Sequence, residues 1–204
     1  MTTNEIHERL RAKFGEDVGP LSEPKVDPFC VVKAERIAEV ARFLKDTPEL
    51  QLDFCEDVAG VDQPKKNVIE VVYHLFSYQH RHGIVLKVEA DRANPVVPTV
   101  ETVWKAANWM EREVYDLLGV VFPGHSDLRR VLLPDDWQGH PLRKDWTEQG
   151  GYHGISNERE NPLVELRRLD EKARAEAAAL APKPPPAAAP AAAPVPVPAP
   201  ENKA

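Results

Sequence analysis

The sequence predicts an α+β fold in which a small mixed or antiparallel sheet carries packed helices and a long extended C-terminal segment follows. Three observations support this prediction. Residues 68–78 and 84–88 contain the β-branched, aromatic and alternating apolar residues of two paired strands. Apolar residues recur at helical spacing on both sides of that hairpin, and the chain beyond residue 119 is rich in turn-forming residues.

The first ninety-eight residues read as an α/β region with the hairpin at its centre. Asn4 is the predicted N-cap of a first helix that places Ile6, Leu10 and Phe14 on one face. Gly15, Gly19 and Pro20 are expected to end that helix. The remaining predicted elements are a strand at 28–32, a helix at about 34–46, a half-buried strand at 50–54, a turn at 60–67 and the turn 79–83 within the hairpin.

A long helix is predicted from Thr99, its N-cap, to Gly119 at its C′ position. Its apolar stripe comprises Val103, Ala107, Met110, Val114 and Leu117. We therefore divide the rest of the chain into this helix with a charged segment (99–154), a C-terminal helix (155–181) and a disordered Pro/Ala-rich tail (182–204). Asn161 and Pro162 are the predicted N-cap and N1 residues of the C-terminal helix.

Composition excludes several classes of function. The net charge of −7 and the lack of a basic stripe argue against nucleic acid or anionic lipid as the main partner. No apolar run is long enough to span a membrane, and the polar start predicts a cytoplasmic chain without a signal peptide. Two cysteines cannot provide the four ligands of an iron–sulfur cluster, and no glycine-rich phosphate-binding motif is present.

Residues 111–146, EREVYDLLGVVFPGHSDLRRVLLPDDWQGHPLRKDW, interleave acids, bases, histidines and tryptophans with prolines and glycines. His125, Ser126 and Asp127 are the residue types of a hydrolytic triad, but consecutive side chains diverge. A metal site from His125, Asp127, His140 and Asp145 is conceivable, although each has a nearby base that could neutralise it. The backbone groups of this irregular segment need partners, which a neighbouring polypeptide could supply.

The same segment closely resembles the signature region of the C subunit of NADH:quinone oxidoreductase, the 30 kDa subunit family of respiratory complex I. The matching positions are Glu111, Arg112, Glu113, Asp116, Leu117, Leu118, His125, Arg129, Val131 and Leu132, together with 139–145. The likeness covers roughly residues 30 to 150. Two positions depart from the family: Ser126 replaces a usual Pro and is expected to loosen one turn, and Trp146 replaces a usual Tyr or Phe.

The resemblance implies a peripheral-arm subunit that has no catalytic, cofactor-binding or metal-binding residues of its own. It implies contacts with the D subunit, which forms the quinone site, and the B subunit, which carries the terminal cluster, at the cytoplasmic face of the inner membrane. In that complex, FMN and Fe–S clusters in partner subunits carry electrons from NADH to quinone, and protons are pumped. The alternatives are an equivalent scaffold subunit of a membrane-bound hydrogenase or other dehydrogenase, and a His/Asp metal-dependent enzyme.

We interpret the signature residues as a subunit interface of paired charges and aromatic anchors. On this interpretation, Arg112→Ala or Arg143→Ala would impair assembly far more than folding. The predicted interface residues are Glu111, Arg112, Glu113, Asp116, His125, Asp127, Arg129, Arg130, Asp135, Asp136, Trp137, His140, Arg143, Lys144, Asp145 and Trp146.

Overall fold

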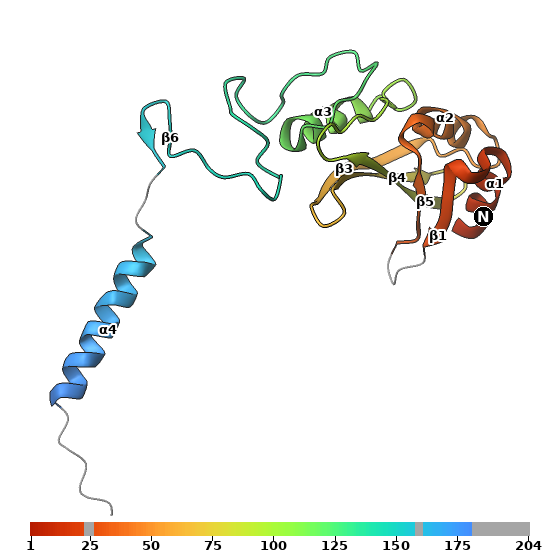
Figure 1. Ribbon diagram of the computed structural model, residues 1–204. Coiled ribbons are helices and arrows are strands. Elements are labelled where there is room, and N and C mark those ends of the chain that lie inside the picture. Colours follow the sequence, from red (N-terminus) through yellow and green to blue (C-terminus); the bar gives the residue numbers. More distant parts are fainter. Residues whose placement is uncertain (23–26, 158–160, 181–204) are drawn as a thin grey trace, which may run out of the picture. The chain divides into compact units, whose positions relative to one another are not determined.

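The computed structural model describes residues 1–22, 27–157 and 161–180 (Figure 1). The chain divides into two compact units, Met1–Glu148 and Gln149–Ala204. The predicted tail, 182–204, lies outside the described residues.

Among the described residues, the first unit contains three α-helices, two short 3-10 helices (Gly15–Asp17 and Ala34–Arg36) and a five-stranded sheet, and the second contains a short hairpin and one helix. In chain order the elements of the first unit are α1 (Thr3–Phe14), β1 (Val18–Ser22), β2 (Phe29–Val32), α2 (Ile37–Asp46), β3 (Phe54–Gln63), β4 (Val68–Ser77), β5 (His82–Asp91) and α3 (Ala107–Leu118). The strand order is β1-β2-β5-β4-β3, and all pairs are antiparallel except the parallel pair β2–β5. The predicted α+β class with a mixed sheet is confirmed.

One face of the sheet forms the core and the other remains partly open. Tyr73, Leu86 and Cys30 form a row across β4, β5 and β2, and all three are almost fully buried. The neighbouring row on the opposite face includes Lys87, whose side chain is a quarter exposed. Helix α3 packs along β3, as Figure 1 shows, and α1 packs against β1 and β5. Apolar burial on one face therefore fixes the strand register.

The predicted N-terminal helix, the strand at 28–32 and the helix at about 34–46 are present as α1, β2 and α2, with two corrections at the start of the chain. The N-cap is Thr2, not Asn4, because the Thr2 hydroxyl and the Glu5 side chain form a reciprocal capping box. Gly15 caps the end of α1, whereas Gly19 and Pro20, also expected to end it, belong to β1. β1 is an edge strand, where a proline is tolerated because one side of the strand is unpaired.

The strand predicted at 50–54 begins only at Phe54 and extends much further than expected. Leu50 and Leu52 are fully buried but precede β3, because turn hydrogen bonds from Leu50 and Gln51 to the Thr47 carbonyl fold this stretch back. Residues 60–63 pair with β4, so the predicted turn at 60–67 shortens to 64–67. His82, expected in the hairpin turn, is buried at the start of β5.

The long helix predicted from Thr99 begins eight residues later, at Ala107. The Thr99 hydroxyl donates to the buried Glu111 carboxylate, and the Lys45 ammonium donates to the Val103 carbonyl. The Trp104 indole is also bonded, to the Leu52 carbonyl. With these tertiary bonds, residues 100–106 form turns, in which the Val103 and Trp104 N–H groups bond to the Val100 carbonyl, and do not continue as a helix. The helix end at Gly119 is confirmed by its left-handed φ of 77°.

The second unit contains β6 (Gly151–Tyr152), β7 (Ile155–Ser156) and α4 (Pro162–Leu180). The helix start is as predicted, and the Leu163 N–H donates to the Asn161 side chain at 3.0 Å. No helix among the described residues has the length and apolar character needed to cross a membrane.

Candidate interaction site

The signature segment is organised around α3, which carries three buried charged side chains. Glu111, Arg112 and Asp116 are each at most 4% exposed. Residues 119–148, all described, contain turns but no helix or strand. The buried charged side chains of α3 form hydrogen bonds with this loop. The helix therefore holds the loop in place.

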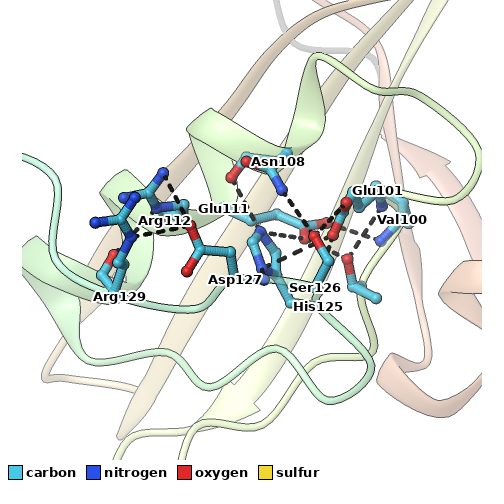
Figure 2. A network of polar contacts seen from close by, with 10 residues as sticks. Val100, Glu101, Asn108, Glu111, Arg112, His125, Ser126, Asp127 and Arg129 are labelled. Carbon is cyan, nitrogen blue, oxygen red and sulfur yellow. Dashed lines mark hydrogen bonds and ion pairs between the residues drawn. The ribbon is translucent and has the colours of Figure 1, made fainter.

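The first cluster joins α3 to residues 99–101 and 125–127 (Figure 2). The Glu111 carboxylate accepts hydrogen bonds from the Thr99 hydroxyl (2.5 Å) and the Val100 N–H (2.7 Å). Burial raises the pKa of Glu111, although these two bonds oppose the rise. The carboxylate is therefore held by neutral donors in the protein interior.

His125 lies beside this carboxylate but bonds to the backbone. The Asp127 N–H donates to its Nδ1 at 3.0 Å, and its Nε2 lies 3.1 Å from the Asn108 carbonyl oxygen. A ring nitrogen that accepts a hydrogen bond carries no proton, so this geometry describes the neutral tautomer with its proton on Nε2. His125 thus links the loop to the first turn of α3.

Ser126 anchors the loop to Glu101 through hydrogen bonds. The expectation that Ser126, in place of the usual proline, loosens a turn is therefore wrong. The Ser126 N–H and hydroxyl both donate to the Glu101 carboxylate, at 2.9 Å and 2.7 Å. These bonds from Ser126 lower the pKa of Glu101 to about 2. A proline at this position would lack the N–H that makes the first bond.

Arg112 is bonded to its own chain. Its guanidinium donates to the carbonyls of Arg129 (3.2 Å) and Arg130 (3.3 Å) and lies 3.8 Å from the Asp127 carboxylate. It also lies over the ring of Trp109, 4.7 Å from the centroid. Trp109 remains 63% exposed, so one buried cation supports an outward-facing aromatic side chain.

Asp116 organises the middle of the loop. Its carboxylate accepts the N–H groups of three successive residues, 131–133, at 2.8–3.1 Å, and pairs with Arg130 at 2.8 Å. Burial alone would raise the pKa of Asp116, but the three N–H groups and Arg130 together lower it. Arg130 also donates to the carbonyls of Trp137 and Gly139, and His140 Nδ1 bonds to the Asp116 carbonyl.

The end of the loop is fixed to the sheet through Asp62 on β3. Arg92 makes a two-pronged contact with Asp62 at 2.7 Å and 3.0 Å, and reaches Asp145 at 2.6 Å. Arg92 is the main cause of the lowered pKa of Asp62. The Lys144 N–H bonds to Asp62, and Arg143 donates to the Leu118 carbonyl at 2.7 Å. Sequence reasoning missed Asp62, Arg92 and Glu101, because all three lie outside residues 111–146 and no local pattern indicates their partners in the loop.

The predicted site residues therefore fall into two groups. Glu111, Arg112, Asp116, His125, Arg130, His140 and Arg143 are buried or half-buried and serve the fold of this chain. Glu113, Asp127, Arg129, Asp135, Asp136, Lys144 and Asp145 are exposed. Trp137 and Trp146 are half-buried and stack with ring centroids 6.1 Å apart. The exposed group, with Trp109, is the surface available to a partner.

The arrangement does not assemble a hydrolytic triad. The Asp127 carboxylate points to Arg129, at 2.9 Å, and Ser126 points to Glu101, so neither side chain serves His125. Among the described residues, no group of three or more His, Cys, Asp or Glu side chains is placed to hold a metal ion. His140 and Asp145, the other proposed ligands, are bonded to Asp116 and Arg92 respectively.

Comparison with known proteins identifies the relatives of this chain. The family described as the 30 Kd subunit of respiratory-chain NADH dehydrogenase matches residues 30–152. The C subunit of NADH-quinone oxidoreductase from Roseiflexus sp. (strain RS-1) is 48% identical over 141 residues, covering 69% of this chain and 81% of the relative. The corresponding C subunit from Geobacter metallireducens is 45% identical over 150 residues, covering 72% and 91%.

Two solved structures resemble the fold. The trypsin-resistant fragment (1-134) of Nqo5 is 29% identical with a TM-score of 0.52, covering 63% of this chain and 100% of the fragment. A chain of the membrane-bound sulfane sulfur reductase, an archaeal respiratory membrane complex, is 25% identical with a TM-score of 0.60. That match covers 78% of this chain and 95% of the other.

Proposed function

Because the chain belongs to the family of the 30 kDa subunit of respiratory-chain NADH dehydrogenase, we propose that it is a non-catalytic scaffold subunit of a proton-pumping NADH:quinone oxidoreductase. It holds the D subunit of the quinone site and the B subunit of the terminal cluster in the peripheral arm, at the cytoplasmic face of the inner membrane. FMN and the iron–sulfur clusters reside in partner subunits, and this chain binds none of them.

The observation that carries this proposal is the internally bonded loop of the family signature. Its buried charges are engaged within the chain, whereas its exposed charges and Trp109 face outward on a surface held by α3. A loop held by so many bonds presents those groups in one arrangement, as a docking surface requires. The family membership indicates that the partners are other subunits of the complex.

The two cysteines support a cofactor-free chain. Cys30 lies in β2 and Cys55 in β3, and both are buried in the apolar core. Burial raises the pKa of each thiol to about 12, so both remain protonated at neutral pH. A protonated, buried thiol is a poor metal ligand.

The proposal is tested by affinity purification of the tagged full chain from its native membranes. We expect the FMN-bearing and cluster-bearing subunits to co-purify with NADH:quinone oxidoreductase activity. Recovery of the chain alone, or of a complex in which the D and B subunits are absent, would refute the scaffold role.

A second candidate is the equivalent scaffold subunit of a membrane-bound hydrogenase or another dehydrogenase. The likeness to a chain of the sulfane sulfur reductase favours this class over a stand-alone enzyme. The same purification separates the two candidates: a co-purified complex that contains no FMN-bearing protein and does not oxidise NADH would replace the first candidate with the second.

A further inference from the structure

The free edge of β3 forms one wall of an apolar groove beside α3. The groove has a volume of about 200 Å³, and its lining includes Ala59 and Gly60 of β3, Val114 and Leu117 of α3, and Leu142 of the signature loop. Leu142 is 53% exposed although its neighbours in the loop are bonded to the body of the unit. An exposed leucine on a well-anchored backbone is a ready contact for another chain.

The strand edge itself is available for pairing. In the order β1-β2-β5-β4-β3, β4 is the one described strand that pairs with β3. Within the described part of the chain, no backbone hydrogen bond outside the β3–β4 ladder involves residues 58–61. These four residues, Val-Ala-Gly-Val, include no proline or charge that would protect an edge. An added strand would satisfy their outward N–H and C=O groups.

The charges around the groove specify the chemistry of the occupant. Asp57 and Glu113 are exposed, and neither forms an ion pair with a residue that the structure describes. Asp57 and Glu113 lie on the groove itself. This contrasts with the signature acids Asp116, Asp127 and Asp145, each of which is paired with an arginine. Unpaired acids around an apolar groove favour a basic partner.

We propose that an extended segment of a neighbouring subunit pairs with the free edge of β3, places an apolar side chain against Leu142 and Leu117, and flanks it with lysine or arginine. This inference rests on the proposed function, which supplies a neighbouring subunit. It deepens that function by assigning the binding mode and the charge of the partner segment. Pairing along the strand edge supplies affinity, and the groove and acidic rim supply specificity.

The first test replaces residues that line the groove in the full, tagged chain. It measures the yield of co-purified subunits from native membranes. Leu142→Glu and the double variant Asp57→Lys/Glu113→Lys are expected to lower the yield at least fivefold. Tyr78→Glu, an exposed aromatic in the β4–β5 turn, and Glu8→Lys on α1 are the matched controls and should leave the yield unchanged. Circular dichroism and urea unfolding check that the groove variants fold.

The outcomes separate this inference from the proposed function. If the wild-type chain co-purifies with its partners and the folded groove variants do so equally well, the groove proposal is overturned and the scaffold role stands. If the wild-type chain recovers no partners, the scaffold role is refuted. The groove proposal is then refuted as well, because it depends on that role.

Hydrogen exchange tests the strand pairing directly. Amides of residues 57–61 that exchange rapidly in the free chain are expected to slow at least tenfold in the assembled complex. A photo-crosslinker at position 142 should capture an extended, lysine- or arginine-containing peptide of another subunit. Unchanged exchange, or a crosslink only to a second copy of this chain, would refute the assignment.

Discussion

Replacing Asp116 removes the acceptor that organises the signature loop. In Asp116→Asn the carboxylate that receives three N–H groups and the Arg130 guanidinium becomes a neutral amide. Its oxygen can keep some of the N–H bonds, but its NH₂ group then faces Arg130 or the backbone donors. The charge that offsets Arg130 is also lost.

The expected loss of stability follows from those contacts. Hydrogen bonds to a charged group contribute about 1.5–3 kcal/mol each, and a buried donor left without an acceptor costs about 1–3 kcal/mol. Leu132 is exposed, and Arg130 is partly exposed, so water relieves part of this loss. We therefore expect Asp116→Asn to lower the free energy of unfolding of the full chain by about 3 kcal/mol at pH 7.

Urea unfolding followed by tryptophan fluorescence measures this difference. With a typical slope of about 2 kcal/mol/M, the midpoint should fall by about 1.5 M. The Asp116 pKa is lowered on folding, so its contribution is present above its unfolded value of 3.8 and is lost as the pH falls through the folded value. The gap between wild type and variant should therefore narrow in strong acid.

Asp127→Asn is the matched control, because Asp127 belongs to the same loop but pairs with Arg129 at the exposed surface. Its effect should be much smaller than that of Asp116→Asn. A loss below about 1 kcal/mol for Asp116→Asn at pH 7 would refute the reasoning, because it would mean that the four bonds contribute nothing net.

Three further predictions concern other parts of the first unit. Glu101→Gln should destabilise the chain at neutral pH, and the difference should diminish as the pH falls from 4.5 to about 2, because the Glu101 carboxyl of the unfolded chain binds a proton in that range before the folded one does; a gap that grows in acid would contradict the assignment. Gly60→Ala should cost about 1–3 kcal/mol in urea unfolding, because an added Cβ would lie 2.2 Å from a methyl carbon of the buried Leu118; an unchanged midpoint would contradict this, since it would mean that the Leu118 side chain gives way at no cost. Cys30 and Cys55 should resist a thiol reagent at pH 8 in the folded chain and react fully in urea; rapid labelling without denaturant would contradict their burial.

Residue types and spacing within a segment correctly predicted the helices and strands whose formation depends mainly on that segment. The β-branched and aromatic residues of 68–78 correctly identified β4, and the helix predicted at about 34–46 is α2, whose buried residues Ile37, Val40 and Leu44 recur at helical spacing. The errors arose where distant groups intervene. Helix α3 starts late because Lys45 and Leu52, more than fifty positions away, bond to Val103 and Trp104. No spacing rule within residues 99–106 contains that information.

The candidate site also combines residues that the sequence pattern identified with distant partners that it did not. The signature residues could be selected from their types, but their partners could not, since the Lys144 N–H meets Asp62 at a separation of 82 positions. The expectation that Arg112 and Arg143 matter for assembly far more than for folding also changes, because both arginines bond to carbonyls of their own chain. Substituting either arginine should therefore lower the stability of the isolated chain, whatever its effect on assembly.

The density of charge in the signature has a physical reason that the sequence pattern alone does not reveal. A thirty-residue loop without helix or strand has only scattered backbone–backbone hydrogen bonds, and its other half-buried backbone groups need side-chain partners. Here charged side chains take the place of secondary structure: Asp116 accepts three N–H groups, and Arg112, Arg130 and Arg143 each donate to two carbonyls. The partners that a neighbouring polypeptide could have supplied are therefore largely internal. It follows that a neighbour needs to contact only the outward residues of a loop whose shape is already set, which lowers the entropy lost on assembly.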